Sequence, residues 1–144
     1  RYYREKVIKG QELWKQYGEG AHRWSLHDLE DGPCHWFWNV LEKRFGLEDI
    51  EPEQPPSIWL FPAGSKIPAH RDPDSLGWIG ACLIGDQPIE FFDDNKNKIE
   101  ELTYDLICVN SQKYHRANVQ GKERVLLRKA FMKTPYSEVV KRFK

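Results

Sequence analysis

The spacing of hydrophobic positions changes near residue 50 and divides the chain into a helical part and a strand-rich part. Residues 4–17 place apolar side chains loosely along one helical side. A second helix is expected after Asp31-Gly32-Pro33, because Pro is tolerated in a first helical turn. Gly46 then supplies a helix stop. Residues 1–50 are therefore predicted to be mainly helical.

Beyond an acidic, proline-rich connector at residues 48–56, short apolar runs alternate with turn signals. The run from Asp93 to Lys98 is typical of a solvated hairpin tip. Eight short strands with close turns favour a barrel or jelly roll. These strands are expected at 57–61, 66–72, 78–85, 89–93, 98–103, 105–110, 115–119 and 124–132.

The length of 144 residues fits a single domain, 1–144, that can bury a sizeable core. We predict a mainly β fold with N-terminal helices. In this arrangement residues 57–132 form the β-barrel core, and residues 1–50 form a helical support against one outer face. Pro135 ends the last strand, and Ser137 is expected to cap a short C-terminal helix.

Composition narrows the class of partner. The 22 basic and 22 acidic residues cancel, so no global field draws the chain to nucleic acid or to an anionic membrane. Six Trp, six Tyr and seven Phe indicate an aromatic core and, in some proteins, an aromatic pocket lining. The cluster Trp36-Phe37-Trp38 is expected to pack into that core.

The three cysteines, Cys34, Cys82 and Cys108, have no CxxC spacing and are odd in number. Cys82 and Cys108 lie in apolar runs, where we expect small buried hydrophobic side chains in a reducing compartment. No apolar run approaches the roughly 20 residues that a membrane span needs, and no secretory signal is evident. The expected location is therefore cytoplasmic, without a membrane span.

His70, Asp72 and His115 are the residues that carry a specific chemistry. On a strand, His70 and Asp72 leave the same face, because they are two positions apart. His115 opens a later strand, which a jelly roll can bring beside them. Two imidazoles and one carboxylate on one face of a metal leave open positions, which suits Fe(II). A cationic side chain just beyond His115 can then hold a dicarboxylate co-substrate.

An HxD pair alone is a weak signal, since an exposed strand His beside a surface Asp arises often by chance. The order HxD, then His115, then Arg124 within an eight-strand pattern favours a metal site. The other histidines, His22, His27 and His35, have no ligand-like spacing. They are interpreted as surface or capping residues.

Four segments resemble Fe(II)/2-oxoglutarate-dependent oxygenases. The first runs from Leu60 to Asp72 and contains Ile67-Pro68-Ala69-His70-Arg71-Asp72; the others are 104–111, 115–119 and 124–127. The closest likeness is to the aspartyl/asparaginyl β-hydroxylase-like branch, with some likeness to the prolyl hydroxylase-like and AlkB-like branches. The resemblance spans residues 57–132, and the helical first third carries no matching motif.

The resemblance implies a double-stranded β-helix, which is a cupin-like jelly roll. It also implies that His70, Asp72 and His115 are the metal ligands at the catalytic centre. Arg124 aligns with the basic residue that binds the distal carboxylate of 2-oxoglutarate, and a planar guanidinium suits that role. Arg128 shares its strand face and is the alternative. Trp59 occupies a co-substrate position and retains an indole N–H.

The main functional hypothesis is an iron-dependent, 2-oxoglutarate-dependent dioxygenase, an oxidoreductase that hydroxylates an unactivated C–H bond. The likeness to these hydroxylase branches suggests an amino-acid or peptidyl side chain as the site of hydroxylation. The expected partner is therefore a small-molecule or peptide substrate. Two alternatives remain open. One is a cupin-type metalloenzyme that uses the same ligands without 2-oxoglutarate, and the other is a non-catalytic β-barrel binding module.

Overall fold

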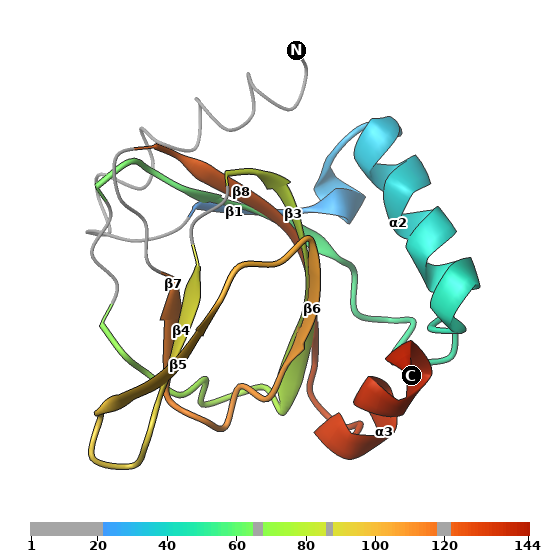
Figure 1. Ribbon diagram of the computed structural model, residues 1–144. Coiled ribbons are helices and arrows are strands. Elements are labelled where there is room, and N and C mark those ends of the chain that lie inside the picture. The colour runs from blue at the N-terminus through green and yellow to red at the C-terminus, as the bar shows by residue number, and fades with distance from the viewer. Residues whose placement is uncertain (1–21, 65–67, 86–87, 118–121) are drawn as a thin grey trace.

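The computed structural model describes residues 22–64, 68–85, 88–117 and 122–144. The helix predicted at residues 4–17 lies outside these ranges. The chain is mainly β, with helices along one side (Figure 1). Its elements are β1 (His22–Ser25), η1 (Leu26–Asp28), α2 (Pro33–Phe45), β2 (Ser57–Phe61), β3 (Gly77–Ile84), β4 (Ile89–Phe92), β5 (Lys98–Leu102), β6 (Leu106–Val109), β7 (His115–Ala117), β8 (Arg124–Phe131), α3 (Tyr136–Val140) and η2 (Lys141–Phe143).

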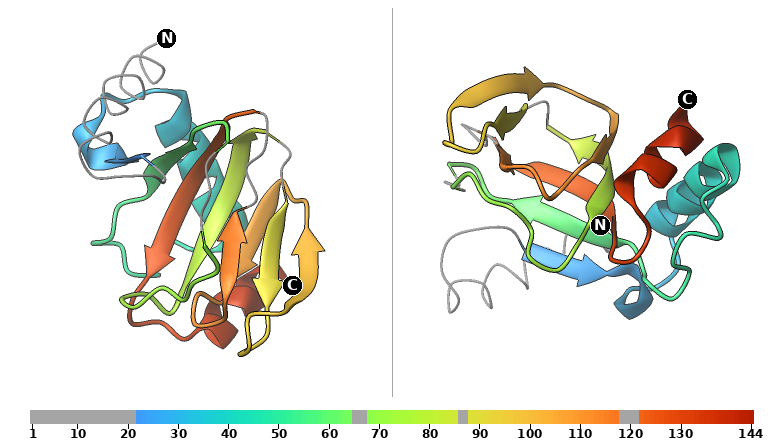
Figure 2. Two further views of the ribbon diagram at one scale, coloured as in Figure 1. Left: turned by 90° about the vertical axis from the view of Figure 1, so that its left-hand side faces the viewer. Right: turned by 90° about the horizontal axis from the view of Figure 1, so that it is seen from below.

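Two antiparallel sheets form the walls of the fold (Figure 2). The larger sheet has the strand order β1-β2-β8-β3-β6, and the smaller has the order β5-β4-β7. The last strand, β8, lies between β2 and β3 in the larger sheet, and β4 pairs with both β5 and β7 in the smaller one. This topology confirms the predicted double-stranded β-helix.

Strand β8 separates the hydrophobic core from the barrel interior. Successive side chains on a strand point to opposite faces. Leu127 and Phe131 pack with Trp38 of α2 and Val139 of α3 in the main core. Arg124, Leu126 and Arg128 occupy the opposite face and line a cavity. Helices α2 and α3 therefore pack on the outer face of the larger sheet and leave its inner face for the site.

Helix α2 begins with Pro33 in its first turn and ends at Phe45, followed by the C-cap Gly46, whose φ of 63° is left-handed. This matches the expected start and stop. The prediction for the aromatic cluster within α2 was right for Trp38, which is buried, and for Phe37, which packs against the core. It was wrong for Trp36, which is 66% exposed. A surface helix has a buried side and a solvent side, so three consecutive residues cannot all point into the core.

Some local predictions differ from the structure. The strand expected at 66–72 is reduced, in the described residues, to a single bridge between His70 and His115, because Pro68 and Pro73 cannot donate ladder hydrogen bonds. Strand β1 was not predicted. Pro135, rather than Ser137, is the N-cap of α3, and no side chain caps that helix.

Several smaller expectations were also tested. The hairpin tip that follows β4 has exposed residues from Asp94 onwards, as predicted. Cys82 and Cys108 are half-buried rather than fully buried, since Cys82 follows the buried stretch of β3 and Cys108 lies on β6, an edge strand of the larger sheet. In the part of the chain that the structure describes, none of the helices has the length and apolar character needed to cross a bilayer.

Candidate metal centre

His70, Asp72 and His115 meet at one end of the barrel. His70 and Asp72 lie on the segment between β2 and β3, and His115 is the first residue of β7. The backbones of His70 and His115 exchange two hydrogen bonds, of 3.1 and 3.0 Å. This pair brings the two imidazole rings to 4.7 Å between centroids. The short bridge therefore performs the role expected of a full strand.

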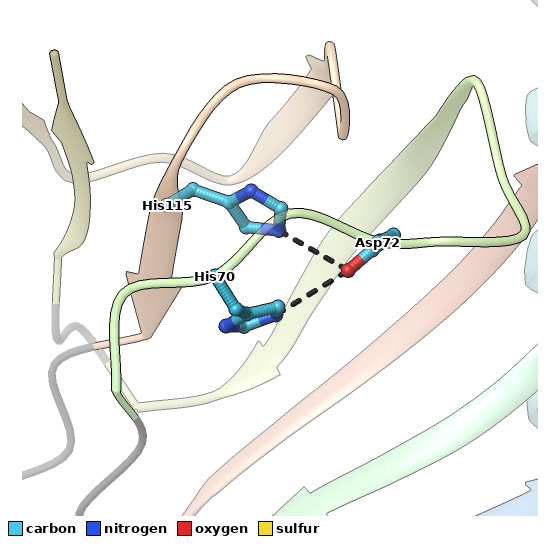
Figure 3. Close-up of side chains that lie close together, drawn as sticks. All are labelled: His70, Asp72 and His115. Atoms are coloured by element: carbon cyan, nitrogen blue, oxygen red, sulfur yellow. Dashed lines mark ion pairs between the residues drawn. The ribbon is translucent and has the colours of Figure 1, made fainter. Parts of the chain in front are cut away.

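The potential ligand atoms of the three residues converge (Figure 3). Oδ1 of Asp72 lies 3.3 Å from Nε2 of His70 and 3.7 Å from Nε2 of His115. One ligand atom from each residue lies within 4.8 Å of the others. This spacing is small enough for all three to bind one cation.

In both imidazole rings, Nδ1 is held by a hydrogen bond to a backbone carbonyl. Nδ1 of His70 donates to the carbonyl of Pro68 at 2.9 Å, and Nδ1 of His115 donates to the carbonyl of Lys113 at 2.7 Å. A carbonyl can only accept, so both Nδ1 atoms carry the hydrogen and a neutral ring presents the Nε2 lone pair. Two lone pairs and a carboxylate oxygen then face one another. Such a group is stabilised by a cation that all three residues bind, or by a proton on one of the rings.

The ionisation of the trio reflects its surroundings. The hydrogen bond with Asp72 raises the pKa of His70, whereas burial lowers the pKa of His115. Burial alone would raise the pKa of Asp72, but its contacts with His70 and the charge of Arg128 outweigh burial and lower it. Asp72 is therefore an anion at neutral pH, as a metal ligand must be.

Two side chains donate hydrogen bonds to Oδ2, the second carboxylate oxygen of Asp72. Arg128 Nη2 donates to Oδ2 at 3.1 Å, and Ser75 Oγ donates to it at 3.3 Å. Ser75 is tied in turn to Ser111, which is fully buried: the two hydroxyls lie 3.0 Å apart, and Ser111 Oγ donates to the Ser75 carbonyl. Ser111 also accepts from the backbone N–H of Asp72 through its carbonyl. The loop before His115 thus holds the loop that carries Asp72.

Arg124 lies deeper in the same cavity and is 1% exposed. Its Nη2 donates to the hydroxyl of Tyr104. Among the described residues, its buried Nε and Nη1 have no hydrogen-bond partner. Burial raises the pKa of Tyr104 to about 12, so the phenol stays neutral beside the guanidinium. Because an unpaired buried cation is costly, this arrangement favours an anionic ligand beside Arg124.

Arg128 has different surroundings. Its guanidinium lies between the rings of Trp59 and Trp78, at 4.5 and 4.4 Å from their centroids. Burial lowers the pKa of Arg128 to about 10, so it remains protonated at neutral pH and pairs with Asp72. Of the two predicted co-substrate arginines, Arg124 is therefore the one without an acidic partner in the described structure.

All six residues singled out from the sequence line one cavity of about 370 Å³. The sequence reasoning missed Tyr104, Ser75, Ser111 and Trp78 as parts of the site. Tyr104 stood in a segment that resembles the family, which was the available signal for it. Nothing in the sequence marked the two serines, since a serine whose hydroxyl is buried cannot be told from one whose hydroxyl faces solvent.

Comparisons with known proteins support the fold. No protein-family model matches the sequence, and no curated protein matches it significantly. A Pseudomonas putida prolyl-4-hydroxylase structure matches with a TM-score of 0.51 and 15% identity, over 80% of this chain and 70% of that one. The collagen prolyl hydroxylase of Paramecium bursaria Chlorella virus-1, in its 2-oxoglutarate complex, matches with a TM-score of 0.50 and 12% identity, over 86% and 88%.

A cupin superfamily protein from Desulfitobacterium hafniense is also similar, with a TM-score of 0.44 and 15% identity over 78% of each chain. Other matches are partial, since the chain covers 24% of a CapF chain and 43% of an oxalate oxidase chain. At these identities the likeness concerns the fold alone. The protein is a cupin-like double-stranded β-helix protein with a His-Asp-His cluster.

Proposed function

We propose that the protein is an Fe(II)- and 2-oxoglutarate-dependent dioxygenase. The observation that carries the proposal is the position of two complementary features in one cavity. Three metal-ligand atoms converge at His70, Asp72 and His115, and the unpartnered guanidinium nitrogens of Arg124 line the same space. Two of the fold matches are prolyl hydroxylases, one of them in a 2-oxoglutarate complex, which agrees with this assignment.

The donor set fits the metal. Two neutral imidazoles and one carboxylate form the ligand combination that suits non-haem Fe(II) and leaves further positions open. The anchored Nδ1 atoms and the hydrogen-bonded Oδ2 of Asp72 are the partners that orient such ligands. When bound, Fe(II) with 2-oxoglutarate supplies the oxidation: O₂ is consumed, the 2-oxo acid becomes succinate and CO₂, and a substrate C–H bond is hydroxylated.

The chain's own residues bind and orient the reactants. Arg124 receives the distal carboxylate of 2-oxoglutarate through Nε and Nη1, while the neutral hydroxyl of Tyr104 holds its third nitrogen in place. Arg128 and Ser75 fix the carboxylate of Asp72. The stacked rings of Trp59 and Phe61, 6.4 Å apart, form an apolar wall that helps to exclude water.

The substrate that we propose is an amino-acid or peptidyl side chain, bound as a free small molecule or as part of a peptide. A cavity of about 370 Å³ lies near the lower limit for ligand pockets. After 2-oxoglutarate is bound, the remaining space suits one side chain or a small metabolite rather than a large folded surface.

An anaerobic titration with Fe(II) and then 2-oxoglutarate tests the proposal. We expect the weak visible charge-transfer band of a chelated 2-oxo acid. The band should be lost in His70→Ala, and Arg124→Ala should need at least about tenfold more co-substrate, since a charge-assisted contact is removed. Metal binding without the band would indicate a cupin-type metalloenzyme instead. No metal binding at all would leave a non-catalytic binding module.

A further inference from the structure

Arg23 lies at the β1 edge of the cavity and is positioned more firmly than an ordinary surface arginine. Its Nε donates to Ser57 Oγ at 3.1 Å, and Ser57 is itself 2% exposed. The Arg23 guanidinium lies 5.9 Å from the ring centroid of Trp59. The strand register places Arg23 directly opposite Trp59. These contacts hold the cation beside the cavity.

A row of alternating cations and aromatic rings runs from this edge to the metal cluster. Trp59 contacts both Arg23 and Arg128, and Arg128 also contacts Trp78. The ring of Trp78 is 6.3 Å from that of His115. The row crosses β1, β2, β8 and β3, which are neighbours in the larger sheet. A ligand that follows this inner face therefore reaches the cluster at one end and Arg23 at the other.

The charges of the cavity do not balance without a further anion. Its lining carries three arginines, Arg23, Arg124 and Arg128, against two acids, Asp72 and Asp74. A divalent metal and doubly charged 2-oxoglutarate cancel each other, which leaves one positive charge. Arg128 is paired with Asp72, and Arg124 faces the co-substrate in the proposed function. In the described residues Arg23 forms no ion pair, and Asp74 is exposed on the loop after the ligands.

We propose that Arg23 forms an anion subsite, so that the substrate carries a carboxylate or phosphate group at the end remote from the oxidised carbon. This inference rests on the proposed function, because it assigns the cluster end of the cavity to the reacting C–H bond. The terminal guanidinium nitrogens of Arg23 are the donors. A guanidinium recognises either oxyanion with two parallel hydrogen bonds. Uncharged analogues of the same shape are therefore expected to bind more weakly.

Matched pairs of small ligands test the subsite. The full chain is loaded with Zn(II) and 2-oxoglutarate, which prevents turnover and occupies Arg124, and binding is measured by ligand-observed NMR. One arm compares N-acetyl amino acids with their carboxamides, and the other compares phenyl phosphate with phenol. We expect at least one anion to bind about tenfold more tightly than its neutral partner. The two arms distinguish a carboxylate from a phosphate.

The variants assign the preference to one residue. Arg23→Gln should reduce the preference to less than about threefold, and Arg23→Lys should retain part of it. Arg44→Gln is the matched control, since Arg44 is also exposed and lies over an aromatic ring, that of Phe45, but on α2. It should leave the preference unchanged.

Two results would overturn the subsite: no preference for any anion in the parent protein, or a preference that survives Arg23→Gln. The charge-transfer band is a separate readout of the proposed function and should be intact in Arg23→Gln. If the parent protein lacks the band, the oxygenase proposal fails, whereas the difference between parent and Arg23→Gln still decides the anion subsite.

Discussion

Arg128 and Asp72 share a hydrogen bond that determines which carboxylate oxygen faces the histidines. Arg128 Nη2 donates to Oδ2 at 3.1 Å, and Oδ1 is the oxygen that approaches His70 and His115. The guanidinium is restricted by the two indole rings on either side of it. Arg128 therefore orients a proposed ligand without being a ligand itself.

Replacing Arg128 should weaken metal binding. In Arg128→Ala the carboxylate of Asp72 loses its charged partner and can rotate, so we expect a loss of about 10- to 100-fold in metal affinity. Co(II) titration followed by visible absorption measures this. Arg128→Lys keeps the charge but not the planar stacking, so its metal affinity should lie between those of the parent protein and Arg128→Ala. Arg44→Ala, on an exposed helix face, is the control and should bind Co(II) as the parent protein does. A Co(II) affinity of Arg128→Ala equal to that of the parent protein would refute the positioning role of Arg128.

Ser111 is expected to matter although it touches no proposed ligand side chain. Its buried hydroxyl donates to the carbonyl of Ser75, the residue that also bonds Oδ2 of Asp72. Ser111→Ala should lower the free energy of unfolding by about 1–2 kcal/mol, and should lower Co(II) affinity by about tenfold because the Asp72 loop loosens.

Ser137→Ala provides the matched control for Ser111→Ala. Ser137 is exposed and makes no capping hydrogen bond, so its loss should change stability by less than about 0.5 kcal/mol. If Ser111→Ala lowers stability but leaves Co(II) affinity unchanged, the serine pair supports the fold alone.

Gly80 leaves room for the ring of Trp78. A Cβ at this position would lie 2.6 Å from Cζ3 of Trp78. Gly80→Ala should therefore displace the ring from Arg128, at a cost of about 1–3 kcal/mol in the free energy of unfolding. Metal affinity should fall with it, because Arg128 loses one of its two stacking partners.

A double-mutant cycle tests whether Gly80 acts through Arg128. If it does, Gly80→Ala should lower Co(II) affinity in the parent protein but not in the Arg128→Ala background. The same decrease in both backgrounds would mean that Trp78 affects the site by another route.

The extent to which the fold could be predicted depended on how local its signals are. Strand 57–61 was predicted at the bounds observed for β2, since apolar residues and flanking prolines mark it in the sequence itself. Strand β1 has four residues, His-Arg-Trp-Ser, and no alternation long enough to recognise. It exists because it pairs with β2, which is a tertiary contact. Short edge strands of this kind have no local signature.

The residues of the candidate site also divide into those that the sequence alone reveals and those that only the tertiary structure brings together. His70, Asp72, His115 and Arg124 form a pattern of residue type and order, and such a pattern can be found in one sequence. The stacking of Arg128 between Trp59 and Trp78 requires three strands to be neighbours, which only the topology determines. The bond between Ser75 and Ser111 likewise depends on two loops that lie far apart in the chain.

Glu51 is a buried acid outside the candidate site, and it joins the segment after α2 to the end of β8. Its carboxylate accepts from the backbone N–H groups of Met132, Lys133 and Thr134 and from the Thr134 hydroxyl. Burial alone would raise the pKa of Glu51, but these hydrogen bonds outweigh burial and lower it below its ordinary value near 4.5. The native state therefore prefers the ionised form more strongly than the unfolded chain does.

Glu51→Gln should accordingly be less stable than the parent at neutral pH, by about 2 kcal/mol, because the amide replaces a charged acceptor. Since the pKa of Glu51 is lowered on folding, the unfolded state binds more protons, and parent stability falls as the pH drops below about 4.5. The difference between the two proteins should then shrink as Glu51 becomes protonated. Denaturant unfolding from about pH 7 to about pH 3 measures both curves.

Glu53→Gln is the control for this last prediction, because it removes an exposed acid two residues away. It should follow the parent curve to within about 0.5 kcal/mol at each pH. A Glu51→Gln curve that runs parallel to the parent curve over the whole range would mean that the four hydrogen bonds stabilise the protonated and ionised forms equally. In that case the lowered pKa of Glu51 would not be a source of stability.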